Sequence, residues 1–595
     1  MVHATPPRSY LYFPSSDVMS TAETIFPQSN KTSISDIALV CDSTPGCIGF
    51  NSNGWLKNGT SSLSPYPVDL YLLEPTPSPA DPLPLWPMPT SITTGSSTLV
   101  VTSSLTFSAS SPCPELTAAF SRFTNDVFKH GEFTGKQSAA KIGAGVLSNL
   151  QIKVKDVTIE LDLGVDESYT LTIPSDGSDV VISSPTTFGA LHALTTLSQL
   201  IRFDFDALAY WIDRSPIEVQ DSPKFAWRGL MVDPARQYLP PDTLRAVVDS
   251  MALAKLNSLH VHILDCDSFP IQVNSPFEKL WMGAFSPRER YTNQDLSGLV
   301  EYARMRGVRI IYEYDQPGHM GAACVGYPEL CPSPDCGTSY GSKVYDPSSS
   351  ITLPAINAVI DTLVSNSIDS VIHLGGDEVN DACWLASPAV LSWMKTNNIT
   401  TGDEIYEYFV EKSNAMALAK NRSPMRWEEV WKHFKTDLDP RTIIHAWLSS
   451  ESLFEAASNG YRTVFSVNSE AYYLDYLDVQ WDDMYKVDIL DGLTNTSSLP
   501  YILGGECAMW GETVDASNIL SVVWPRAAAI SERLWSYNFD TSKATDYDTI
   551  NRLSMFKCLL TERGVTASLQ GAINAGDMRP AWTVGSCLGG YKKLC

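Results

Sequence analysis

Eight short apolar segments recur along the later part of the chain, and stretches with helical periodicity separate them. The segments cover residues 227–233, 257–265, 308–315, 370–378, 424–429, 442–447, 461–467 and 502–510. Buried strands that alternate with helices in this way are typical of a (β/α)8 barrel. A doubly wound open sheet is the alternative, but no glycine-rich phosphate loop follows any segment. We therefore expect an α/β fold with a barrel over residues 223–595.

Two further regions precede the expected barrel. Alternating strand patterns and two helical patterns predict a small α+β accessory domain over residues 84–222. A proline-dense stretch at residues 74–89 predicts a stiff linker. Residues 1–80 form a Ser/Thr/Asn-rich module in which a Cys41–Cys47 bridge would close a small loop. This module resembles an apple/PAN-type adhesion module, and a decorated N-terminal extension is the alternative.

The charge balance and the cysteines limit the partners and the compartment. The chain has 42 Lys and Arg against 67 Asp and Glu, a formal charge of −25, which argues against nucleic acid or anionic membranes as partners. No run of about 18 apolar residues occurs, so no membrane span is expected. Twelve cysteines favour the secretory route, with a lysosome-like or extracellular location. Glycosylation sequons support this at Asn30, Asn58, Asn398, Asn421 and Asn495.

Polar and aromatic residues stand at or after the ends of the expected strands. In a (β/α)8 barrel these ends meet at one mouth, where active sites lie. The set comprises Asp233, Arg236, Asp265, Asp315, His319, Asp377, Glu378, Trp427, Trp447, Tyr473, Asp475, Trp510 and Glu512. A single strand-end Asp is often only a helix cap. The whole set suits a sugar, because apolar sugar faces stack on rings and charged groups bind hydroxyls.

The HVH sequence at residues 260–262 raises the question of a metal. His260 and His262 face the same way on a strand and could bind a metal in a metal-dependent barrel hydrolase. The motif lies inside its strand, so structural histidines are favoured, and we expect no metal or organic cofactor. Cys266 and Cys507 lack the context of thiol nucleophiles, and buried cysteines are favoured there.

The segment HLGGDEVNDACW sets two carboxylates, Asp377 and Glu378, side by side after two glycines. Most glycosidases hold two carboxylates several ångströms apart across the substrate. Neighbouring strand residues point to opposite faces, so this pair does not fit the usual combination of nucleophile and acid.

Together these segments resemble the β-N-acetylhexosaminidases, glycoside hydrolase family 20. The matching stretches are RGLMVDPARQYLP, MALAKLNSLHVHILD, EYARMRGVRIIYEYDQPGH, HLGGDEVNDACW, GGECAMWGE and WPRAAAISERLW. They occur in order across nearly the whole expected barrel. The stretch from LWPMP to TTLSQL resembles the accessory domain of the family, so that the resemblance covers about residues 84–595.

The resemblance implies a role for each residue of the site. Glu378 would be the general acid/base, Asp377 would hold the 2-acetamido group of the substrate, and Tyr473 would bond the acetamido oxygen. Three tryptophans would box the N-acetyl group and the ring: Trp427, Trp447 and Trp510. Three polar residues would hold the ring hydroxyls: Arg236, Asp475 and Glu512. Two residues would support Glu378 from behind: Asp265 and His319.

The resemblance also implies a mechanism in which the acetamido oxygen of the substrate is the nucleophile. It would form an oxazoline that water opens with net retention, an exception to the two-carboxylate rule. Asp377 is then expected to stay ionised, and the pKa of Glu378 is expected to be raised. The expected activity is removal of terminal β-linked GlcNAc or GalNAc from a glycan, and a homodimer is a further expectation. A carbohydrate-binding pseudoenzyme is the alternative.

Some positions depart from the pattern of the family. Val261 and Cys266 stand where the family often has Trp and a second Asp, and Gln237 replaces a common His. No basic residue follows Asp475, which favours neutral sugars. Cys113 lacks a nearby partner. The disulfides that the resemblance implies are Cys558–Cys587 and a bridge of Cys383 with Cys331 or Cys336.

Overall fold

The structure is a computed structural model, and it describes residues 82–131, 145–205, 207–333, 343–537, 543–544 and 546–568, with six short strands before them. The chain divides into a unit Met1–Pro82 and a unit Leu83–Cys595. The described strands of the first unit are β1 (Tyr10–Phe13), β2 (Ser16–Val18), β3 (Gly49–Asn51), β4 (Leu56–Lys57), β5 (Leu63–Pro65) and β6 (Leu70–Leu73). They pair in the order β1-β6-β3-β4, with β2 paired to β5. Cys41 and Cys47 lie outside the described residues, and the apple/PAN-type module stays a prediction.

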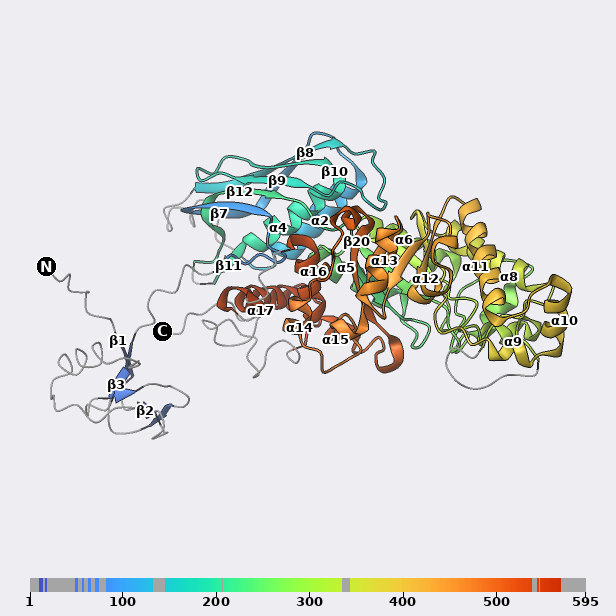
Figure 1. Ribbon diagram of the computed structural model, residues 1–595. Coiled ribbons are helices and arrows are strands. Elements are labelled where there is room, and N and C mark those ends of the chain that lie inside the picture. Colours follow the sequence, from blue (N-terminus) through green and yellow to red (C-terminus); the bar gives the residue numbers. More distant parts are fainter. Residues whose placement is uncertain are drawn as a thin grey trace. The chain divides into compact units, whose positions relative to one another are not determined.

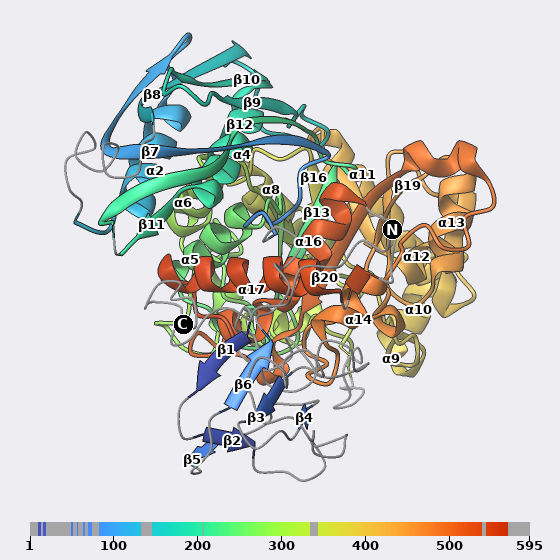
Figure 2. The ribbon, with the colours of Figure 1, turned by 90° about the vertical axis from the view of Figure 1, so that its left-hand side faces the viewer.

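The second unit begins with a six-stranded sheet of the order β11-β12-β7-β8-β10-β9. Its strands are β7 (Ser91–Ala109), β8 (Gly145–Asp156), β9 (Tyr169–Ile173), β10 (Val180–Thr186), β11 (Arg202–Asp204) and β12 (Ala209–Asp221). Residues of β9 alternate between buried and exposed, because one face of the sheet packs against helices. Those helices are α2 (Pro114–Val127) and α4 (Thr187–Leu200), which lie on one side of the sheet in Figures 1 and 2. The expected α+β fold is confirmed.

The rest of the second unit contains a closed, parallel, eight-stranded barrel, which confirms the expected fold class. Each strand overlaps one of the expected apolar segments. The strands are β13 (Trp227–Val232), β14 (Ser258–His262), β15 (Arg309–Glu313), β16 (Val371–His373), β17 (Ser423–Trp427), β18 (Ile443–Ala446), β19 (Arg462–Phe465) and β20 (Ile502–Met509). Most of their residues are buried, because helices cover the outside and side chains fill the inside.

Helices follow the barrel strands in chain order. The longer ones are α5 (Pro241–Leu253), α6 (Asn293–Arg304), α8 (Thr352–Ser365), α10 (Pro388–Asn397), α11 (Gly402–Ala419), α13 (Ser450–Ser458), α16 (Arg526–Ser536) and α17 (Tyr547–Glu562). Shorter ones are α7 (Ala323–Gly326), α9 (Ala382–Ala386), α12 (Glu428–Phe434), α14 (Trp481–Lys486) and α15 (Ile519–Val523). Capping boxes begin three of them, Thr292 with Asp295 at α6, Thr401 with Glu404 at α11 and Gln480 with Asp483 at α14.

The accessory domain is joined to the barrel by buried ion pairs at the N-terminal ends of the first strands. Arg228, at the start of β13, donates through both terminal nitrogens to Glu167, at 2.6 and 2.9 Å. His192 of α4 contacts the same carboxylate at 2.8 Å. Lys255 pairs with Asp221, the last residue of β12, at 3.0 Å. This attachment leaves the other end of the barrel for the site.

The cysteines correct one expectation. Cys324 and Cys331 form a disulfide, with Cα atoms 5.9 Å apart, so a Cys331–Cys383 bridge is wrong. Cys383 and Cys558 are each disulfide-bonded, but Cys336 and Cys587, the other expected partners, lie outside the described residues. Cys113 is a half-buried free thiol. Within the described ranges, no helix is long and apolar enough to cross a membrane.

Candidate active site

A cavity of about 320 Å³ opens where the barrel strands end. It is lined by Arg236, His319, Asp377, Glu378, Trp427, Trp447, Tyr473, Asp475, Tyr476, Trp510 and Glu512. Asp265, which was expected behind Glu378, lies beneath this wall and is 2 % exposed. The structure therefore brings together all the residues of the expected site. Tyr476 is the wall residue that the sequence reading missed, and its only signal was an aromatic residue directly after Asp475.

The backbone after β16 explains how two adjacent acids can serve one cavity. Gly375 and Gly376 adopt positive φ angles of 57° and 104°, and Glu378 itself has a φ of 49°. A Cβ on Gly375 would lie 1.9 Å from Oδ1 of Asp315, so a side chain cannot fit there. The turn sends Asp377 into the interior and leaves the Glu378 side chain half exposed. Such strained positions are common at functional sites.

Asp377 is a buried carboxylate without enough partners. It is 8 % exposed, and its Oδ1 accepts no hydrogen bond. Burial raises its pKa well above the ordinary value, and the adjacent Asp315 carboxylate raises it further. Both effects oppose the ionisation that is expected of Asp377, because two buried carboxylates lie next to each other.

Glu378 has the opposite electrostatic setting. Nε2 of His319 lies 3.6 Å from its Oε2, too far for a hydrogen bond, and the contact with this imidazole lowers the pKa of Glu378 although partial burial acts against it. The expected raised pKa is therefore wrong for the substrate-free protein. Nδ1 of His319 lies 3.2 Å from Asp265, and the nearby carboxylates raise the pKa of His319 well above its ordinary value despite burial. Glu378 thus faces an imidazolium.

Asp265 holds a second cation beside the first. The Arg236 guanidinium lies 2.9 Å from Asp265 and 3.2 Å from Asp233, over the ring of Trp510 at 4.9 Å. In the same cavity, burial raises the pKa of Asp475 to about 6, and its Oδ1 accepts no hydrogen bond. A fixed cation and an acceptor without a donor in one cavity suit a ligand that carries hydroxyl groups.

Aromatic rings form the remaining walls. Trp427 is nearly fully buried, and its Nε1 donates to Glu313 at 2.7 Å. The rings of Trp447 and Tyr473 lie nearly parallel with centroids 6.4 Å apart, and Nε1 of Trp447 donates to Glu429 at 2.8 Å. These hydrogen bonds fix both indole planes, so the cavity presents flat apolar surfaces of set orientation.

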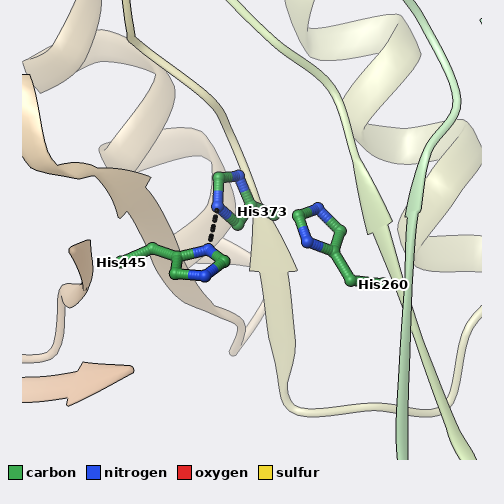
Figure 3. Close-up of side chains that lie close together, drawn as sticks. All are labelled: His260, His373 and His445. Carbon is green, nitrogen blue, oxygen red and sulfur yellow. Dashed lines mark hydrogen bonds between the residues drawn. The ribbon is translucent and has the colours of Figure 1, made fainter. Parts of the chain in front are cut away.

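Three histidines meet inside the barrel, beneath the cavity. Figure 3 shows His373 between His260 and His445, with the His373–His445 hydrogen bond of 3.3 Å dashed. His260 has carboxylates at both ring nitrogens, Glu506 at 2.7 Å and Glu313 at 2.9 Å. These carboxylates raise its pKa to about 9 against the effect of burial, and they occupy both nitrogen positions through which it would bind a metal.

The second histidine of the HVH motif has a different set of neighbours. His262 contacts Glu313 at 2.5 Å and Asp265 at 2.8 Å. His260 and His262 are thus each held between two carboxylates, and this donor set does not fit their shared use as metal ligands. The free thiols Cys266 and Cys507 are also poor nucleophiles, because burial raises the pKa of both, to about 11 for Cys266.

Comparisons with known proteins agree with this geometry. Residues 225–538 match the family model "Glycosyl hydrolase family 20, catalytic domain", and residues 85–200 match "beta-acetyl hexosaminidase like". The chain is 39% identical to "Beta-hexosaminidase 1" of Arabidopsis thaliana over 526 residues, covering 86% of this chain and 95% of that protein. It is 33% identical to "Beta-hexosaminidase subunit alpha" of Mus musculus over 484 residues, covering 77% and 87%.

A solved structure is also similar over most of the chain. The chitobiase of Flavobacterium johnsoniae aligns with a TM-score of 0.70 and 27% identity, covering 81% of this chain and 73% of that one. A family model that spans more than half of the chain and relatives that match over most of their length lead to one conclusion. The chain belongs to glycosyl hydrolase family 20 and is a glycosidase of the β-hexosaminidase type.

Proposed function

We propose that the protein is a retaining exo-β-N-acetylhexosaminidase that removes terminal β-linked GlcNAc or GalNAc through an oxazoline intermediate. The observation that carries this proposal is the pairing of Asp377, a buried carboxylate whose Oδ1 accepts no hydrogen bond, with a half-exposed acid, Glu378, in one cavity. The other carboxylates that line the described cavity, Asp475 and Glu512, are assigned to the ring hydroxyls. The nucleophile is then supplied by the substrate.

In the first step the acetamido oxygen attacks the anomeric carbon while the bond from that carbon to the leaving oxygen breaks. Glu378 gives its proton to the leaving oxygen. Asp377 accepts a hydrogen bond from the acetamido N–H and stabilises the positive charge that develops there, and the Tyr473 hydroxyl donates to the acetamido oxygen. In the second step Glu378 takes a proton from water. The water attacks the anomeric carbon from the face that the leaving group occupied, and this opens the oxazoline.

Substrate binding would move both pKa values in the direction that this mechanism needs. An N–H donor against Asp377 favours its charged form, so the pKa of Asp377 falls on binding. A sugar ring that displaces water from Glu378 disfavours its charged form, so its pKa rises. Trp427, Trp447 and Trp510 would enclose the N-acetyl group and the ring.

Three polar residues would hold the ring hydroxyls: Arg236, Asp475 and Glu512. The residue after Asp475 is the aromatic Tyr476, which supports a preference for neutral sugars over acidic ones. A matched pair of GlcNAc and GalNAc glycosides, which differ only at the 4-hydroxyl, would show which of the two sugars is preferred.

The test is a panel of aryl β-glycosides of GlcNAc, GalNAc and glucose with the wild type and Glu378→Gln, all with a weakly acidic phenol whose departure needs protonation. We expect turnover of the two acetamido sugars, no comparable turnover of the glucoside, and a loss of about 100- to 10,000-fold in kcat for Glu378→Gln. Little loss in that variant, or equal turnover of the glucoside, would refute the mechanism. Because the chain is assigned as a glycosidase, the alternative of a carbohydrate-binding pseudoenzyme has no support.

Location, assembly and domain limits complete the proposal. The Cys324–Cys331 disulfide and the sequons support passage through the secretory route to a lysosome-like compartment or the outside. A mass decrease on enzymatic deglycosylation of the natively produced protein would be the expected result. The homodimer stays a prediction, and light scattering would test it by measuring the mass of the particle in solution.

We also propose domains at residues 1–80, 84–222 and 223–595, on the basis of the matched ranges and the strand order.

A further inference from the structure

One buried carboxylate contacts both a residue of the cavity wall and the histidines that lie behind it. Glu313, the last residue of β15, is fully buried. Its Oε1 accepts from Nε1 of Trp427 at 2.7 Å, and its Oε2 lies 2.5 Å from Nδ1 of His262. The rings of His260 and His373 approach the same carboxylate at 2.9 and 3.2 Å.

Two chains of contacts lead upward from this carboxylate. The shorter one ends at Trp427, which lines the cavity. The longer one passes from His262 to Asp265 at 2.8 Å and from Asp265 to His319 at 3.2 Å. It ends at Glu378, 3.6 Å from His319. Except for the half-exposed Glu378, each member of this chain is nearly fully buried, so water does not replace a lost contact.

We propose that Glu313 is a positioning residue for the hydrolysis, which fixes His262 and through it the Asp265–His319 pair that orients the acid Glu378. This inference rests on the proposed role of Glu378. The Trp427 contact ties the same carboxylate to the cavity wall. Glu313 touches no substrate in this arrangement, and it acts only through its neighbours.

The charges around Glu313 explain why a carboxylate is needed there. Burial alone would raise its pKa, but the imidazoles of His262, His373 and His260 more than offset this and hold the pKa well below its ordinary value. His262 has a carboxylate at each ring nitrogen, so both nitrogens donate. With a neutral group at position 313, His262 could lose its Nδ1 proton and turn, and Asp265 would lose a fixed donor.

The test is Glu313→Gln assayed on two substrates that differ in their need for an acid. Gln keeps the shape and an acceptor for Trp427 but removes the charge that His262 faces. On an aryl β-GlcNAc glycoside with a strongly acidic phenol, departure needs little protonation. On a β-GlcNAc disaccharide it needs full protonation. We expect kcat to fall about 10- to 100-fold on the disaccharide, to fall much less on the activated glycoside, and KM for both to change little.

The matched control is Asp369→Asn. Asp369 is also a buried carboxylate and pairs at 3.0 Å with Arg309, at the opposite end of the same strand β15. Its loss lowers stability without reaching the cavity, so any loss of kcat per folded molecule should be equal on the two substrates. Equal losses for Glu313→Gln would overturn the proposal, because a merely structural role acts alike on both substrates.

Two further variants make the result decisive. His262→Asn keeps a donor toward Glu313 and removes the donor toward Asp265, so it should reproduce the selective loss even if Glu313→Gln does not fold. If His262→Asn is unselective, the proposal is wrong. Glu378→Gln must itself show the selective loss. If it does not, the proposed function fails, and if it does while the other two variants do not, only the role of Glu313 fails.

Discussion

Two buried charge clusters lie at opposite ends of the barrel, and they differ in how far their charges are balanced within the protein. The base cluster joins the accessory domain to the barrel and consists of Glu167, His192, Asp221, Arg228 and Lys255. Each of its carboxylates faces a cation and several donors, which together hold the pKa of Glu167 at about 2 although burial opposes this.

The mouth cluster consists of Asp265, Asp315, His319, Asp377 and Glu378. Here Asp315 and Asp377 lie next to each other, burial raises the pKa of both, and each has a buried oxygen that accepts no hydrogen bond. The base cluster satisfies its charges within the protein and so stabilises the fold. The mouth cluster leaves charges for a ligand to satisfy, at a cost in stability.

The largest expected effect comes from Asp377→Asn. Kinetics should show kcat on aryl β-GlcNAc glycosides reduced by about 100- to 1,000-fold, because the developing charge loses its anion. Thermal unfolding should show an unchanged or higher Tm, since a buried pair of like acids is relieved. A clearly lower Tm would mean that Asp377 is part of the structural support and that the comparison is wrong.

The reverse behaviour is expected of Arg228→Met in the base cluster. Glu167 would be left buried without its main cation, which should cost about 3–5 kcal/mol in the free energy of unfolding. Denaturant titration measures that loss, while kcat per folded molecule should stay at the wild-type value. A selective loss of kcat at full folding would show that the two clusters are coupled.

The base cluster should also make the free energy of unfolding fall over a defined range of low pH. Glu167 has a pKa of about 2 in the folded chain against an ordinary value near 4.5, so it contributes about 3 kcal/mol above that ordinary value. Because the folded pKa is depressed, this contribution is lost as the pH falls from about 4.5 to 2. Urea unfolding of wild type and Glu167→Gln over this range should show the two stabilities converging, and a constant difference would contradict the assignment.

The smallest effect is a shift of one limb of a pH profile. His319 is the main cause of the lowered pKa of Glu378, so His319→Gln should raise that pKa. Activity in kcat/KM needs protonated Glu378 and ionised Asp377. Because the pKa of Asp377 is raised and that of Glu378 is lowered in the free protein, the pKa of Glu378 sets the rising limb of the profile. The rising limb should therefore move to higher pH in the variant, beside a general loss of rate. A limb that stays in place or moves to lower pH would show that His319 does not lower the pKa of Glu378.

Much of this site was predictable from the sequence, because the barrel rule places strand ends at one mouth. Arg236 after β13 and Trp510 after β20 are far apart in the chain, yet both were expected at the cavity and both line it. The strand pattern was strong because buried parallel strands are nearly continuous apolar runs.

What the sequence could not provide were the contacts between side chains. The directions of the pKa shifts of Asp377 and Glu378 do not follow from the sequence, because they depend on Asp315 and His319 at set distances. The contacts of Glu313 were invisible for the same reason, since its partners come from three other strands. The Cys324–Cys331 bridge depends on a local turn that the spacing alone did not indicate.

The central claim is that the substrate supplies the nucleophile and that Asp377 assists it. The most direct measurement is kcat/KM for aryl 2-N-acyl-glucosaminides whose acetyl group carries none, one, two or three fluorines. Fluorine withdraws electrons from the acyl oxygen, so the account predicts a steep, monotonic fall along the series. In Asp377→Asn the fall should start from a much lower rate. A flat dependence in the wild type would show that the acyl oxygen does not attack, and it would contradict the account.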